Sequence, residues 1–98
     1  MADLVPLTDA RLQCRLAADE RSEDQLLNGY IAAAQRVCAA ITGFDLSPTA
    51  PVAITAENAA VVKQAMLVMV AHWFENRDDP GTPRAALWLL GTIRRRRL

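Results

Sequence analysis

The sequence predicts an all-α fold, a small bundle of about four helices. Two observations support this. Apolar side chains recur every three or four residues along the longer stretches, and proline and glycine stand between those stretches. With 98 residues the chain has the length of one domain. We therefore expect a single domain over residues 1–98, with a basic tail at 94–98.

The first helix is expected to begin at Thr8, a residue suited to capping a helix N-terminus, and to end at Leu16 or Ala17. In such a helix Leu12 shares the apolar face with Leu16. Cys14 then projects to the opposite side, toward solvent or a neighbouring molecule.

The second helix is expected from Glu23 to Thr42. Ser22 and Gln25 have the spacing of a capping box at its start, and Gly43 is suited to end it. Gly29 lowers helix propensity, so we expect it to permit close approach of another helix. The apolar positions that repeat at helical spacing are Leu26, Leu27, Tyr30, Ile31, Ala34, Val37, Cys38 and Ile41.

A proline-containing loop is expected over residues 44–56, since Pro48 and Pro51 exclude a helix there. Within it, residues 52–55 fit either a short strand or half of a small hairpin. The third helix, from Glu57 to Asn76, is apolar most of the way round, which indicates burial on more than one side. A small domain has difficulty surrounding such a helix, so we expect a second subunit against it.

The fourth helix follows a turn at residues 77–82. Thr82 is the expected cap and Pro83 the first helical residue, and the helix is expected to end at Arg95. Its apolar face is expected to contain Ala86, Leu87, Leu90 and Ile93. Trp88 lies off that face, which makes it a candidate for a contact with another subunit.

No pattern of residues predicts an enzyme, a metal site or a cofactor. His72 is the only histidine, and no cysteine or carboxylate accompanies it at metal-ligand spacing. We expect it to be hydrogen-bonded at a packing edge. Asp78 and Asp79 are explained by the turn in which they lie. Cys14 and Cys38 show no disulfide spacing.

The net charge of zero hides an asymmetry. Arg94 to Arg97 carry four of the eleven positive charges, and without them seven positive charges face eleven negative ones. Such a tail fits contact with an acidic protein surface, contact with DNA phosphates, or no role beyond solubility.

We expect no secretory signal, because the N-terminus carries an early acid and no long apolar core. The apolar stretch from Ala59 to Phe74 is shorter than the roughly 20 residues that cross a bilayer. A cytoplasmic location is expected, unless the chain leaves the cell within a larger particle.

Residues 70–77, VAHWFENR, resemble a motif of the small head–tail connector proteins of tailed bacteriophages, also called adaptor or neck proteins. Phe74 replaces the usual tyrosine. Similar features occur at Cys14–Leu16, at the acidic connection before Leu27, and at the Thr42–Gly43 helix end. The resemblance spans residues 7 to 93.

This resemblance implies a helical virion protein that forms a ring, usually of twelve subunits, beneath the portal. The ring joins the DNA-filled head to the tail or the next neck protein and extends the DNA channel. The same fold also serves in phage-like gene-transfer particles. The implied partners are further copies of the chain, the portal, the next neck, stopper or tail protein, and double-stranded DNA by non-specific contact. Assembly is expected in the host cytoplasm, and no membrane, cofactor or enzymatic activity is implied.

Two sets of residues are expected to act in that role. Candidates for packing within and between subunits are Tyr30, Val62, Met66, Met69, Trp73, Phe74 and Trp88. Candidates for docking on the portal, or for DNA contact, are Arg94, Arg95, Arg96 and Arg97. The mildly acidic remainder of the chain suits a channel that must release DNA.

Two other classes of protein stay open at this stage. One is a small helical regulatory or nucleic-acid-binding protein that uses the arginine run, which predicts salt-dependent DNA binding by the isolated chain. The other is a helical enzyme subunit, which requires a pocket with several polar groups of perturbed pKa.

Overall fold

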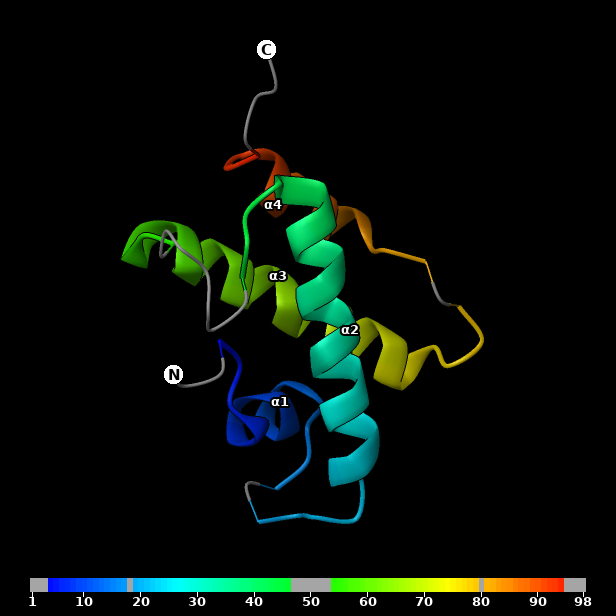
Figure 1. Cartoon of the computed structure of the whole chain (residues 1–98). Helices are drawn as coiled ribbons and strands as arrows, with labels where there is room; N and C mark the ends of the chain where they lie inside the picture. The colour runs from blue at the N-terminus through cyan, green and yellow to red at the C-terminus, as the bar shows by residue number, and fades with distance from the viewer. Residues whose placement is uncertain (1–3, 18, 47–53, 80, 95–98) are drawn as a thin grey trace.

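The computed structural model describes residues 4–17, 19–46, 54–79 and 81–94. These contain four α-helices and no strand: α1 (Leu7–Gln13), α2 (Asp24–Thr42), α3 (Ala56–Glu75) and α4 (Arg84–Gly91). The all-α prediction is therefore confirmed. In Figure 1, α3 crosses behind α2, while α1 lies beside the first half of α2 and α4 beside its second half.

The centre of the fold is α3, which contacts each of the other three helices. Its buried side chains lie on several sides of the helix and are Val62, Ala65, Met66, Leu67, Met69, Val70 and Trp73. Among the described residues, the large apolar side chains that are exposed lie on α1 and α4 and are Leu12, Leu87 and Trp88. These buried side chains are covered by α1, α2 and α4 of the same chain, whereas contact of α3 with a second subunit stays a prediction.

The first helix ends earlier than its apolar pattern indicates. Arg15 has a φ of 63°, in the left-handed region. The N–H of Leu16 donates to the carbonyl of Arg11 over 2.8 Å, and the N–H of Arg15 donates to the carbonyl of Leu12 over 3.0 Å. This pair of bonds is a Schellman motif, which closes the last turn of a helix. The helix therefore stops at Gln13.

The buried side of α1 also differs from the prediction. Leu12 is 57% exposed, whereas Cys14 is only 6% exposed. Ala10 and Arg11 are buried beside Cys14. The expected positions of Leu12 and Cys14 were wrong, because the pairing of Arg11 with a carboxylate on α2 turns the other side of α1 toward the core.

The start of α2 lacks the expected capping box. Its N-cap residue is Glu23, which makes no side-chain cap hydrogen bond, and the N–H of Ser22 donates instead to the Glu20 carboxylate over 3.0 Å. The helix ends as predicted at Gly43, which has a φ of 80°. Gly29 is exposed, and a Cβ there would meet no atom within 4 Å. It therefore makes no close helix contact within the chain.

The helices α3 and α4 follow in the predicted order, but their first and last residues differ from the prediction. Thr55 caps α3, accepting a hydrogen bond from the N–H of Asn58 over 3.2 Å. The N-cap of α4 is Pro83 rather than Thr82, and the helix stops at Gly91, four residues before the predicted end at Arg95. A strand or half of a hairpin was suggested for residues 52–55. Residues 52 and 53 lie outside the described residues, and Ile54 and Thr55 are not in a strand. No helix within the described ranges has both the length and the apolar character to cross a membrane.

Candidate functional site

The first candidate surface is the outward side of α4. Trp88 is 71% exposed and the adjacent Leu87 is 44% exposed, while Ala86 and Leu90 face the core. Leu87 was expected on the buried face, and its exposure corrects that prediction. Trp88 therefore exposes a large apolar surface to solvent. Exposed aromatic side chains of this kind are enriched at protein interfaces.

The second candidate surface is a groove between α2 and the end of α3, here called the aromatic groove. It has a volume of about 340 Å³ and is lined by Tyr30, Ala33, Val37, Trp73 and Arg77. The Tyr30 and Trp73 rings lie 5.9 Å apart between centroids and are tilted by 53°. This separation is typical of aromatic pairs that stabilise one another. The groove is therefore mainly apolar, with one cation at its edge.

Several contacts hold the side chains of the aromatic groove in place. The indole N–H of Trp73 donates to the carbonyl of Gly81 over 3.0 Å, across the turn between α3 and α4. The guanidinium of Arg77 lies 5.3 Å from the centroid of the Phe74 ring. It also lies 3.7 Å from the carboxylate of Glu23. The groove is thus preformed in the single chain.

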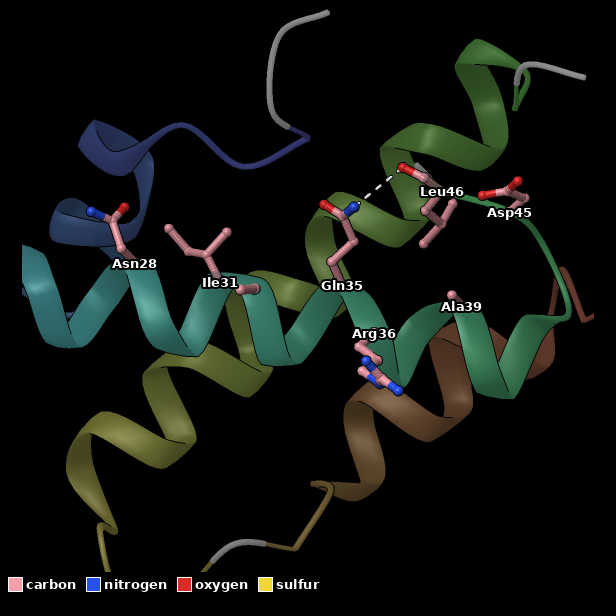
Figure 2. A pocket seen from close by; sticks show the side chains of 8 residues that line it. Asn28, Ile31, Gln35, Arg36, Ala39, Asp45 and Leu46 are labelled. Atoms are coloured by element: carbon pink, nitrogen blue, oxygen red, sulfur yellow. Dashed lines mark hydrogen bonds between the residues drawn. The ribbon is translucent and has the colours of Figure 1, made fainter. Parts of the chain in front are cut away.

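The exposed surface of α2 carries few charges. Its exposed residues are Gln25, Asn28, Gly29, Ala32, Ala33, Arg36 and Ala40. A second groove, of about 540 Å³, flanks the same helix and is lined by Asn28, Ile31, Ala32, Gln35, Arg36, Ala39, Asp45 and Leu46. Figure 2 shows Gln35 directed at Leu46, whose carbonyl accepts its amide N–H over 3.2 Å, while Arg36 points away from this bond.

Two charged pairs connect α1 to α2 and to α3. The guanidinium of Arg11 donates two hydrogen bonds to the carboxylate of Asp24, over 2.9 and 2.7 Å. This bond lowers the pKa of Asp24 and raises that of Arg11. Lys63 and Asp9 form a more exposed pair over 2.7 Å, which connects α3 to α1. Both pairs connect α1 to a neighbouring helix.

His72 contacts the turn that follows α3. Its Nε2 atom lies 3.2 Å from the carboxylate of Asp79, and that carboxylate also accepts the N–H of Gly81 over 2.9 Å. The Gly81 bond is the main cause, and the His72 bond a further one, of a lowered Asp79 pKa. The predicted hydrogen bond at a packing edge is confirmed. Within the described part of the chain, no group of three histidine, cysteine or carboxylate side chains is placed to hold a metal ion.

The structure separates the predicted contact residues into three groups. Val62, Met66 and Met69 are fully buried inside the chain. Trp73 is 8% exposed, and Tyr30 and Phe74 are half-buried, so these three reach the surface at or beside the aromatic groove. Trp88 and Arg94 are exposed, and Arg95, Arg96 and Arg97 lie outside the described residues.

Sequence reasoning missed two surface residues. Arg77 lies in the resembling motif, yet its position at the aromatic groove depends on the fold. Leu87 fits the periodic pattern of a buried position, but Ala86 and Leu90 are the residues of α4 that face the core.

Together, the described helices form a small all-α protein whose notable surface features are apolar and suited to contacts with other proteins. The chain belongs to the phage gp6-like head-tail connector family, whose model matches residues 5–85. Members of this family are structural proteins that join phage heads to tails, and the family places the chain in the virion neck, in association with other head and tail proteins. No curated protein and no solved structure gives a significant match to the chain.

Proposed function

We propose that this chain forms a closed ring, of twelve copies as the resemblance implies, beneath the portal of the DNA-filled head. The ring extends the DNA channel and presents a surface to the next neck, stopper or tail protein. The observation that carries this proposal is the family match over residues 5–85, which includes all of α1, α2 and α3.

The surface of the chain supports a role in assembly. The described surface has an indole that is 71% exposed next to a leucine that is 44% exposed, and exposed aromatic side chains are enriched at protein interfaces. We assign contact between copies to the exposed side of α4 and to the aromatic groove, with Tyr30, Trp73 and Phe74 at the groove and Trp88 on α4.

The fully buried candidates act indirectly. Val62, Met66 and Met69 pack α3 against its neighbours within one copy. They give the ring subunit a rigid body rather than a contact surface. Substitutions there are expected to reduce assembly only as far as they reduce folding.

The arginine run is assigned to docking on the portal. Arg94 is exposed after the end of α4, a helix that already carries exposed apolar side chains. Deletion of residues 94–98 should leave a ring that no longer attaches to the portal. Unchanged attachment would contradict this assignment.

The experiment that tests the proposed function is the mass of the purified full chain, alone and mixed with its portal protein, measured by native mass spectrometry. A ring, either alone or on the portal, is the expected result. A monomer that ignores the portal and binds DNA with a steep dependence on salt would favour the nucleic-acid-binding alternative instead.

A further inference from the structure

Two apolar features of the described surface have complementary shapes. One is a protruding side chain, Trp88, and the other is a recess, the aromatic groove. Trp88 is not among the residues that line the groove of its own chain. We propose that Trp88 of one copy occupies the aromatic groove of the next copy, an inference that rests on the proposed ring and specifies its contact.

The chemistry of the groove fits an indole. Tyr30 and Trp73 present two tilted rings 5.9 Å apart, and aromatic side chains attract further rings in tilted or offset arrangements. Ala33, three residues after Tyr30 on α2, lines the groove and is exposed, so its small side chain leaves the recess open. The guanidinium of Arg77, which lies over the Phe74 ring, also lines the groove, and tryptophan is the best aromatic partner for such a cation.

The charges near the two features are also complementary. Arg84 is exposed and lies one helical turn before Trp88 on α4. Glu23 lies beside the groove, 3.7 Å from Arg77. In the proposed contact, Arg84 of one copy and Glu23 of the next supply opposite charges beside the indole, with the Glu23 carboxylate shared between Arg84 and Arg77.

The arrangement accounts for a ring rather than a pair. The protruding side chain and the recess are different surface patches, so each copy uses one patch toward each of its two neighbours. Such a head-to-tail contact generates a closed ring when its rotation closes, whereas a contact between identical patches stops at a dimer. The occupant is therefore a second copy of this chain.

The test uses full-length variants that change one feature each. Trp88→Glu removes the protruding side chain, and Ala33→Trp fills the groove. The matched controls are Leu12→Glu, which alters another exposed leucine, and Ala32→Trp, which alters the adjacent exposed alanine on the other groove. Trp88→Ser and Ala33→Arg repeat the two changes with different chemistry, and circular dichroism verifies that each variant is folded.

Sedimentation velocity and native mass spectrometry, alone and with the portal, give the readout. We expect Trp88→Glu and Ala33→Trp each to weaken association by about 30-fold or more, as for central interface residues, and both controls to assemble like the wild type. A mixture of the two defective variants should form one-to-one pairs, because one intact Trp88 and one intact groove remain between them.

The outcomes separate this inference from the proposed function. Rings formed by Trp88→Glu or by Ala33→Trp would overturn the contact and leave the ring proposal standing. Equal disruption by Ala32→Trp, or a mixture of defective variants that makes no pairs, would also overturn the contact. A wild-type chain that forms no ring even with the portal would overturn the proposed function itself.

Discussion

The guanidinium of Arg11 and the carboxylate of Asp24 form a pair of parallel hydrogen bonds, 2.9 and 2.7 Å long, between α1 and the first turn of α2. Arg11 is 8% exposed. Two-bond pairing of arginine with carboxylate fixes orientation as well as adding attraction. The pair therefore determines which side of α1 faces the core.

Removal of this pair should destabilise the chain more than removal of the exposed one. Arg11→Ala leaves Asp24 without its guanidinium and takes packing from the inner side of α1. Lys63→Ala, at a pair whose lysine side chain is 41% exposed, should lower the free energy of unfolding by at most about 1 kcal/mol. Urea unfolding of the two variants measures the difference. An equal loss in both would contradict the orienting role of Arg11.

The same pair predicts a dependence of stability on acid. The Arg11 bond holds the pKa of Asp24 below its ordinary value of 3.8. A carboxyl with a lowered folded-state pKa stabilises the fold above its unfolded pKa, and this contribution is lost as the pH falls through the folded value. The stability advantage of wild type over Asp24→Asn should thus be constant near neutral pH and shrink below about pH 4. Urea unfolding at a series of pH values measures it. A constant advantage down to pH 2 would contradict the assignment.

Arg15 is a site where glycine should stabilise the chain. Its φ of 63° costs an L-residue about 1–2 kcal/mol, whereas glycine adopts this conformation without that cost. Glycine also gives the unfolded chain more freedom, which offsets about 0.4–1 kcal/mol. Arg15→Gly should raise the free energy of unfolding by about 0.5–1 kcal/mol. Thermal unfolding measures this, with Arg15→Ala as the control that keeps the strain. A lower melting temperature for Arg15→Gly than for the wild type would show that the arginine side chain stabilises the fold by more than its positive φ destabilises it.

The two cysteines should resist alkylation in the folded chain. Burial raises the pKa of the Cys38 thiol to about 12, and burial together with the nearby charge of Glu75 raises that of Cys14. Since the thiolate is the reactive form, iodoacetamide at pH 8 should modify neither residue quickly until urea unfolds the chain. Cys14, just after the short α1, should react before Cys38 by local opening. Mass spectrometry of timed samples gives the order. Reaction of Cys38 in the folded chain at the rate of the unfolded one would contradict its burial.

Periodicity located the helices well where one helix face is apolar and the other polar. In α2 the predicted core positions Leu27, Ala34 and Cys38 are buried, and Gly43 ends the helix as expected. The apolar density of α3 correctly indicated burial on several sides. Helices of the same chain provide this burial, which a periodic pattern does not reveal, and contact of α3 with another subunit stays a prediction.

The errors on α1 and α4 have a common physical cause. The burial of Arg11 depends on Asp24, thirteen residues away, and the exposure of Leu87 depends on how α4 lies on α3. Such relationships come from tertiary packing, which overrides local pattern in short helices. The aromatic groove has the same origin, because Tyr30 and Arg77 are far apart in the sequence.

The contact of α3 with every other helix also governs how the chain opens. No neighbouring helix can leave without exposing part of α3, whereas the middle of α3 is released only when all three neighbours separate. The backbone amides of residues 65–70 should therefore exchange hydrogen for deuterium through global unfolding alone, while amides of the seven-residue α1 exchange sooner through local opening. Because α2 also contacts every other helix, α2 and α3 together form the slow-exchanging part of the subunit, and the shorter helices α1 and α4 are less protected.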